Sequence, residues 1–416
     1  PGDLALSVLF KTRLGHWAQA TRIQGSDSRL DLAPDDEQNT DQSDANHYAS
    51  HLAGRKKMMN PCFKNGLRIA AVFSLMMLVF LGFQTTARAQ TVSGHEPSIC
   101  VFDLLGAKGP IFNLAQEYAL EGRKNGYGFK PVVYTNESIA TKDFEIGVCD
   151  GLVATGIRTR KYNSFTGSLD AVGGLPNYDA VLLALKSMGS PQLQPVMQQS
   201  DFEVGGVLPF GTAYVFVRDR EINSLAKAAG KRVAALSHDE SQRRLIEQVG
   251  AQPIAADVSN YGSMFNNGAV DIIVAPSIAY SPLELYKGLG KKGAIIQLPV
   301  AMVTYQIILR KSKFQPGSGQ KLRAFVAQEM PKALNAVKKI DRQIPDKAWL
   351  KMTDADKLEY TTMMREARIS LSKDGVYDGC ALRLLKKVRC ALDGKASECS
   401  LPEGYTVPKS CPIQPM

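Results

Sequence analysis

The stretch GVCDGLVATGIRTRKYNSFTGS (147–168) decides the fold and raises the functional question. Its first ten residues are mostly small and apolar, which is typical of a buried strand. Arg158 and Arg160 follow at once, and a polar loop with glycines comes next. Side chains alternate between the faces of an extended chain, so both guanidinium groups would point the same way if the chain stays extended. Two interpretations are open: a solvated loop, or an anion pocket at the carboxyl end of a strand.

This strand is the third in a pattern of alternating strands and helices. The segments 98–105 and 129–135 are strand-like, and 111–126 between them has helical spacing, begins after a proline and ends at a glycine. A short helix is expected around 138–142. The alternation predicts a parallel α/β sheet. In the common strand order 2-1-3, the first and third strands are neighbours.

A second α/β unit follows a long β-rich stretch at 205–220, which suits a strand shared between two lobes. Its expected elements are strands at 231–236, 251–256 and 269–276 and a helix at 239–250. β structure returns at 291–314, and the pattern then becomes helical to about residue 373, with breaks expected at Pro331 and Pro345. The expected fold is a two-lobed α/β protein of the periplasmic-binding-protein type, with long β crossings and a helical C-terminal region.

Two facing lobes of this kind form a cleft at the carboxyl ends of their strands, where α/β sheets bind ligands. The predicted divisions of the folded chain are lobe one at 90–211, lobe two at 212–304, a return segment with helices packing across the lobes at 305–345, and a cysteine-containing helical cap at 346–416.

The segment 58–89 has the three parts of a secretory signal peptide. Basic residues precede an apolar run at 69–83, and an A-x-A cleavage site ends at Ala89. A transmembrane anchor is the alternative, but it needs about 20 apolar residues. Residues 1–57 are polar and mixed in charge, so we expect a disordered upstream segment that is not native, with translation starting at one of the methionines that open the signal. The predicted location is the periplasm.

Cysteine usage agrees with export. Cys62 would leave with the signal peptide, and the six that remain are Cys100, Cys149, Cys380, Cys390, Cys399 and Cys411. An even number in an exported chain favours disulfides. Cys100 and Cys149 fall at the amino ends of neighbouring strands about 4.8 Å apart, so we predict that they pair. The other four allow three connectivities. Zinc is the alternative, but without C-x-x-C we expect no metal and no other cofactor.

Several short motifs follow one another along both predicted lobes. They are Gly147, Asp150, Pro176, Arg232 in GKRVAAL, GAQPIAA (250–256), Tyr261 and GAVD (268–271). This order resembles the periplasmic solute-binding proteins of TRAP transporters over roughly 98–345. The resemblance implies a two-lobed binding protein whose arginine selects the solute. That family usually has K-x-R, whereas Lys231 and Arg232 are adjacent here.

A second group of motifs is more specific. It comprises ICVFDLLG (99–106), CDG (149–151), TGIRTR (155–160) and FTGSLDA (165–171). These resemble the AdeT-type solute-binding proteins, which are linked by name to aminoglycoside efflux. An efflux pump needs many transmembrane helices, and the sequence has none after the signal peptide. The four-cysteine tail is not part of the TRAP pattern.

The candidate ligand-binding residues come from the strand ends and from the resemblance. They are Arg158, Arg160, Asn163, Arg232, Ser237 and Tyr261. Arginine matches a carboxylate with two parallel hydrogen bonds. The competing interpretation of the first loop is a hinge whose arginines are solvated or paired with Asp170. Ser237 and Glu240 have the spacing of a helix capping box, which is its competing role.

We therefore expect a monomeric periplasmic binding protein that captures a small organic anion between its lobes for a membrane transporter. The alternative is an accessory or sensory protein for a polyamine or aminoglycoside-like cation, working with an efflux component, and it predicts a cleft lined by Asp103, Asp150 and Asp271. The net charge of +10 fits an anionic partner, but no basic block indicates nucleic acid. An enzyme is not expected, because G-x-S-x-G is absent and histidines are few.

Overall fold

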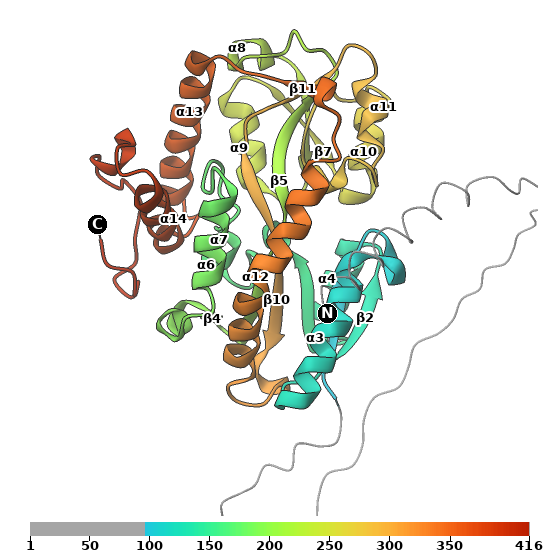
Figure 1. Cartoon of the computed structure of the whole chain (residues 1–416), viewed down its shortest axis with the longest axis vertical. Coiled ribbons are helices and arrows are strands. Elements are labelled where there is room, and N and C mark those ends of the chain that lie inside the picture. Colours follow the sequence, from blue (N-terminus) through green and yellow to red (C-terminus); the bar gives the residue numbers. More distant parts are fainter. Residues whose placement is uncertain (1–95, 416) are drawn as a thin grey trace, which may run out of the picture. The chain divides into compact units, whose positions relative to one another are not determined.

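In the computed structural model, the structure describes residues 96–415. The predicted signal peptide and upstream segment lie outside the described residues. The described residues belong to one compact unit, Gln90–Met416, built around a mixed sheet (Figure 1). The main path of the sheet runs β2-β1-β3-β10-β5-β8-β6-β7.

Lobe one follows the predicted alternation of strands and helices. Its elements are β1 (Ser98–Phe102), α3 (Pro110–Asn125), β2 (Lys130–Tyr134), α4 (Glu137–Glu145) and β3 (Gly151–Thr155). The order β2-β1-β3 is parallel, as predicted. Helix α3 starts with proline at its first position and ends at Gly126, whose left-handed backbone favours glycine. Cys100 and Cys149 form the predicted disulfide, with Cα atoms 5.7 Å apart.

Two long antiparallel strands connect the lobes. They are β5 (Phe202–Val217) and β10 (Ala301–Arg310). The second half of β10 pairs with β3 of lobe one, and the second half of β5 pairs with β8 (Ile272–Pro276) of lobe two. Their side chains are buried almost throughout, so both strands belong to the core of both lobes.

Lobe two repeats the α/β arrangement. Its elements are α8 (Leu225–Ala228), β6 (Arg232–Leu236), α9 (Glu240–Gln248), β7 (Gln252–Ala256), α10 (Val258–Asn266), β8, α11 (Leu285–Leu289) and β9 (Ala294–Ile296). Strands β6, β7 and β8 are parallel. The carboxyl ends of β6 and β7 therefore open onto the same edge of the sheet.

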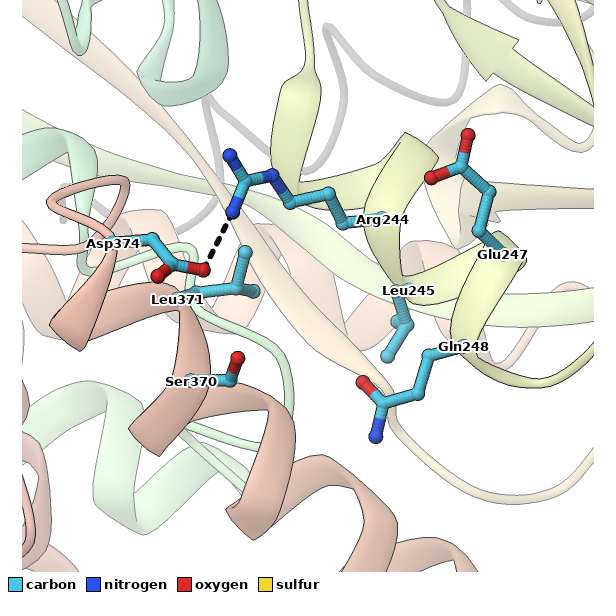
Figure 2. A pocket seen from close by; sticks show the side chains of 7 residues that line it. All are labelled: Arg244, Leu245, Glu247, Gln248, Ser370, Leu371 and Asp374. Atoms are coloured by element: carbon cyan, nitrogen blue, oxygen red, sulfur yellow. Dashed lines mark hydrogen bonds and ion pairs between the residues drawn. The ribbon is translucent and has the colours of Figure 1, made fainter.

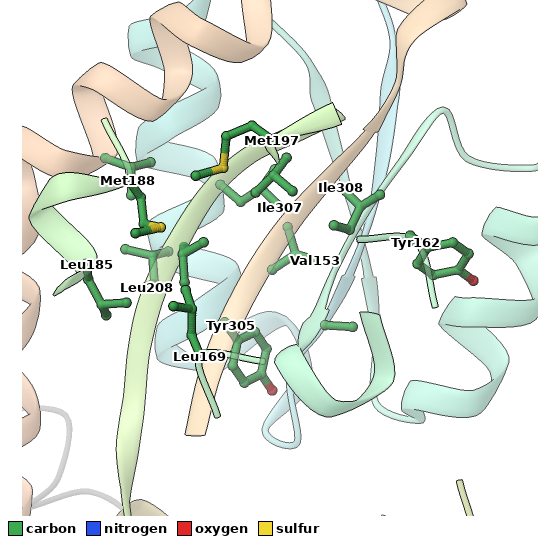
Figure 3. Packing of buried hydrophobic residues seen from close by; sticks show 14 of the residues in the cluster. Val153, Tyr162, Leu169, Leu185, Met188, Met197, Leu208, Tyr305, Ile307 and Ile308 are labelled. Carbon is green, nitrogen blue, oxygen red and sulfur yellow. The ribbon is translucent and has the colours of Figure 1, made fainter. Parts of the chain in front are cut away.

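The largest apolar core lies in lobe one, between the sheet and the helices packed on it. Leu185 and Met188 of the α7 region (Tyr178–Ser187) face Leu208 and Ile307 of the long strands (Figure 3). Lobe two has smaller clusters around Phe216 and Val217. The loops at the strand ends of lobe one therefore rest on a larger apolar core than those of lobe two.

Helix α12 (Ser318–Asp341) packs against β5 and α7 and runs through Pro331 without a break. The predicted break there is wrong. Proline in a helix interior costs about 3 kcal/mol, but α12 buries an apolar stripe that includes Met330 and Leu334, and this packing outweighs the local penalty. The helix ends before Pro345, as predicted.

The C-terminal cap consists of helices and a cysteine-linked tail. Its elements are β11 (Trp349–Leu350), α13 (Asp354–Lys373) and α14 (Gly379–Leu392). The disulfides are Cys380–Cys411 and Cys390–Cys399, which settles the three possible connectivities. Helix α14 packs against α7 and against α6 (Ser164–Gly167) of lobe one.

Candidate functional site

The candidate site lies where the carboxyl ends of two pairs of parallel strands meet, β2 and β3 of lobe one and β6 and β7 of lobe two. Glu137 follows β2, Arg158 and Arg160 follow β3, and two groups of lobe two meet them: His238 and Asp239 after β6, and Asp257 after β7. Both lobes therefore bring titratable side chains to the same place, which is the location expected for a ligand in an α/β protein.

The chain turns immediately after β3, so the condition under which both arginines would point the same way is not met. Residues Gly156–Thr159 form a helical turn, α5, and the Thr155 side chain caps it by accepting a hydrogen bond from the Arg158 amide. Successive helical residues are rotated by about 100°. The side chains of Arg158 and Arg160 therefore diverge and reach different partners.

Arg158 lies between one carboxylate from each lobe. Its Nε atom is 3.5 Å from Glu137 Oε2, and its Nη2 atom is 3.9 Å from Asp257 Oδ2. The Arg158 side chain is only 11% exposed, and that of Glu137 is fully buried. Neither Nε nor Nη2 makes a hydrogen bond within the described part of the chain, and Glu137 Oε2 accepts none. Burial raises the pKa of Glu137, although the Thr155 amide donates to its other oxygen at 2.8 Å.

His238 lies beside this cluster at the end of β6. Burial and the positive charge of Arg158 lower its pKa to about 4, so the imidazole is neutral near pH 7. Its Nε2 atom has no hydrogen-bond partner among the described residues. A half-open cavity of about 610 Å³ adjoins it and is lined by Ala235, Leu236, Ser237, His238, Asp239, Glu240, Arg243, Pro253 and Ala255.

Arg160 is engaged in several interactions. Its Nε atom donates to the Gly167 carbonyl at 3.1 Å, and its Nη1 atom lies 3.4 Å from Asp239 Oδ1 and 3.3 Å from Ser241 Oγ. Its guanidinium also lies over the ring of Tyr377, 5.2 Å from the centroid. Asp239 and Ser241 belong to lobe two, so Arg160 joins the two lobes directly.

The loop that carries the arginines is held rigidly by buried hydrogen bonds. Gln306 of β10 accepts from the hydroxyls of Thr159 and Thr166 at 2.9 Å each and donates to the Thr166 carbonyl. Asn163 caps α6 and donates to the Val196 carbonyl, so its amide is committed to structure. This bonding argues against the hinge interpretation of the loop.

Asp170 forms hydrogen bonds with β10 and, among the described residues, does not pair with an arginine. Its carboxylate accepts hydrogen bonds from the Thr304 hydroxyl at 2.6 Å and from the Thr304 amide at 3.2 Å. Burial raises its pKa to about 7. No ion pair joins Asp170 to an arginine within residues 96–415. The positive charge of Arg160 is nevertheless close enough to lower the pKa of Asp170 in part.

Two predicted residues are not brought to the site. Arg232 is the first residue of β6, at the opposite end of the strand, where it is exposed and pairs with Asp271 at 2.7 Å. Tyr261 is a core residue of lobe two, and its hydroxyl contacts the carbonyls of Ala234 and Val274. The structure offers neither residue to a ligand at the carboxyl ends of the strands.

Ser237 lies at the edge of the site but does not cap the following helix. Its hydroxyl donates to the Ala256 carbonyl at 3.0 Å. The cap of α9 is Asp239, which accepts from the amides of Ser241 and Gln242. The predicted capping box of Ser237 is therefore wrong.

The aspartates of the cation-binding alternative do not line a common cleft. Asp103 accepts hydrogen bonds from the amides of residues 105, 111 and 112 and thereby fixes the start of α3. Asp150 accepts from the Ser98 amide at the amino ends of the strands, and Asp271 pairs with Arg232 at the amino ends in lobe two.

Sequence reasoning missed Glu137, Asp239, Asp257 and Tyr377. The three acidic residues carried a usable signal, because each lies one to three residues beyond the end of a strand. Tyr377 carried none, since only tertiary packing of the cap brings it to Arg160. In the described residues no helix is long and apolar enough to cross a membrane, and no cluster of candidate metal ligands occurs.

Known structures share this fold. A TRAP periplasmic solute binding protein from Desulfovibrio salexigens, with bound orotic acid, gives a TM-score of 0.58 at 15% identity over 71% of this chain and 97% of its own. One from Desulfovibrio desulfuricans, with bound sn-glycerol-3-phosphate, gives 0.59 at 12% identity over 73% of this chain and 99% of its own.

Sequence relatives are closer than these structures. The sequence model of the family described as "Solute-binding protein AdeT 1/2" matches residues 119–404. The "Probable solute-binding protein AdeT1" of Acinetobacter baumannii is 42% identical over 301 residues, which cover 72% of this chain and 99% of that protein. The AdeT2 protein of the same organism is 28% identical over 235 residues, covering 56% and 99%. The chain belongs to the AdeT 1/2 family of solute-binding proteins.

Proposed function

We propose that this protein captures a small organic acid between its two lobes, in the periplasm, and presents it to a membrane transporter. Capture requires no covalent chemistry. Arg158 is the principal anchor for the carboxylate of the solute, and His238 and Ser237 border the bound molecule from lobe two.

The hydrogen-bond state of Arg158 carries this proposal. Nearly all buried polar groups in proteins have a hydrogen-bond partner. Arg158 is an exception, because its Nε and Nη2 atoms make no hydrogen bond within the described residues, although Glu137 and Asp257 lie 3.5 Å and 3.9 Å away. These two atoms lie on the same edge of the guanidinium and match the two oxygens of a carboxylate. A bound organic acid would satisfy both donors together.

The acidic groups of the site already have donors, which favours an anion over a cation. Asp239 caps α9 and receives Arg160, and Asp257 caps α10 through the Ser259 amide. Glu137 accepts from the Thr155 amide, and its raised pKa opposes the charged form. Among the described residues, a cation would find one buried carboxylate oxygen without a donor, Glu137 Oε2, in a side chain that is fully buried, whereas a carboxylate would find two guanidinium donors without a hydrogen bond.

The ligands of solved structures that share the fold give independent support. They include orotic acid, sn-glycerol-3-phosphate and malonate, and each is an anion. Sequence identity to these proteins is 15% or less, so their ligands suggest a chemical class and no particular compound. The transporter partner and the periplasmic location rest on the same analogy, together with the predicted signal peptide.

Calorimetric titration and thermal shift test the proposal. Malonate, succinate and orotate should raise the melting midpoint through mass action, whereas spermidine and an aminoglycoside should not. Arg158→Lys keeps the charge but loses the paired geometry, so it should weaken binding of the active acid about 10- to 100-fold, the worth of one charge-assisted hydrogen bond. Arg123→Lys, in an exposed pair with Glu96, is the matched control. A shift with the cations alone would overturn the proposal.

A further inference from the structure

The turn between α13 and α14, residues 374–378, reaches the candidate site from the C-terminal cap. Asp374 lies at the end of α13, Tyr377 packs against Arg160, and Asp378 caps α14. The disulfide Cys380–Cys411 fixes the start of α14 directly behind this turn. The cap therefore delivers side chains to the place where the two lobes meet.

On the side of lobe one, the cap is fastened by buried groups. The Asp378 amide donates to the Ser168 hydroxyl at 2.8 Å. Arg368 donates to the Val172 carbonyl at 2.9 Å, and Arg389 donates to the Gly174 carbonyl at 2.7 Å. Both arginines are buried and share the carboxylate of Glu398. Because these bonds are buried, they attach the turn and α14 firmly to lobe one.

On the side of lobe two, the turn 374–378 contacts α9. Elsewhere in the cap, β11 pairs with β9, and α13 packs against apolar side chains that include Leu225 and Val300. Figure 2 shows Arg244 of α9 and Asp374 of α13 pointing toward one another across a groove, and their closest atoms are 2.6 Å apart. Tyr377 is the second contact. Its ring lies under the Arg160 guanidinium that pairs with Asp239, and burial raises the pKa of its hydroxyl. The Arg244–Asp374 pair is partly exposed and Tyr377 contributes a single ring, so these contacts can break and form again.

We propose that the turn 374–378 is a latch that holds lobe two closed on lobe one. Tyr377 is a positioning residue: its ring holds the Arg160 guanidinium in contact with Asp239 of lobe two. Asp374 engages Arg244 of the same helix, so the cap secures α9 at two points. This inference deepens the proposed function, because capture between lobes requires a closed state that lasts.

The arrangement assigns different tasks to the two arginines. Arg158 keeps two donors for a solute, whereas Arg160 is occupied by Gly167, Asp239 and Tyr377. When lobe two moves away, the Arg160–Asp239 and Arg244–Asp374 contacts break, but the buried bonds between cap and lobe one persist. The turn 374–378 and α14 thus stay with lobe one, and the turn meets α9 again on closure.

Distance measurements between spin labels test the latch on the full protein as purified, without added solute. Labels at Leu120→Cys on α3 and Tyr286→Cys on α11 report on lobe one and lobe two, and both positions are exposed. Tyr377→Ala should lower the ratio of closed to open molecules about fivefold, the effect expected for one partly desolvated cation–π contact. Tyr377→Phe keeps the ring and should retain the closed distance.

Asp374→Asn is the second variant, and it keeps the test decisive if Tyr377→Ala fails to fold. It should lower the same ratio about twofold, as for a surface ion pair. Asp354→Asn, at the exposed start of α13, is its control and should change nothing. Unchanged distances in both test variants would overturn the latch, even if organic acids bind. If no acid binds but the distances lengthen as described, the latch stands and the proposed function fails.

Discussion

Replacing Arg158 with alanine should destabilise the folded protein by about 3 kcal/mol at pH 8. The change leaves the Glu137 carboxylate fully buried without its cationic partner. Breaking a buried pair by removing one partner costs about 3–5 kcal/mol. The low end applies here because the contact is 3.5 Å long and the Thr155 amide still donates to Glu137. At about 2 °C per kcal/mol for a domain of this size, the melting midpoint should fall by about 6 °C.

The loss should depend on pH with a defined sign. Burial already raises the pKa of Glu137 above its usual 4.5, and removing Arg158 raises it further, since Arg158 is among the groups that lower it. A carboxyl group whose pKa is higher in the folded state takes up a proton on folding, so stability falls as pH rises above 4.5. The deficit of the variant should therefore be largest at pH 8 and shrink toward pH 5.

Urea denaturation at pH 5 and pH 8 measures both effects. The double variant Arg158→Ala with Glu137→Gln should regain most of the lost stability, because the neutral amide still accepts from the Thr155 amide. Arg123→Ala, which breaks an exposed pair, should leave the midpoint unchanged. Equal stability of Arg158→Ala and the unaltered protein at pH 8, or no recovery in the double variant, would show that Glu137 does not depend on Arg158.

Three further predictions concern the surroundings of the site. Gly156→Ala should lower the melting midpoint, since the added methyl would lie 2.6 Å from the Asp170 carboxylate; an unchanged midpoint would contradict this packing. Removing Cys380–Cys411 as a double alanine variant should cost about 3–4 kcal/mol by loop entropy, and hydrogen exchange should show the cap opening first. The pKa of His238, about 4, lies below its usual 6.5, so the histidine contributes stability that is lost as pH falls through this window; NMR titration of the ring should show it neutral at pH 5.5.

Local sequence signals predicted lobe one well because local physics determines it. The proline and glycine that bound α3 act within a few residues, and the order β2-β1-β3 follows from the alternation of elements. The pairing of Cys100 with Cys149 then followed from strand adjacency. Packing between distant segments was not predictable in this way. Pro331 lies inside α12 because the apolar stripe of that helix is buried by β5 and α7.

Only the part of the site that depends on local sequence was predicted. The position of Arg158 and Arg160 at the end of a strand could be read from the chain, but their partners could not. Asp239 and Asp257 meet them only through the facing of two lobes, and Tyr377 only through a cap pinned by disulfides. Arg232 was chosen by resemblance, and the structure places it at the other end of its strand.

A crystal structure of the protein as purified from its native host tests the central claim most directly. We expect density for a small organic acid between the lobes, with one carboxylate held by Nε and Nη2 of Arg158 and the neutral ring of His238 nearby. Density for a polyamine or aminoglycoside against Glu137 and Asp257, or a bound solute that leaves the Arg158 guanidinium untouched, would contradict this claim.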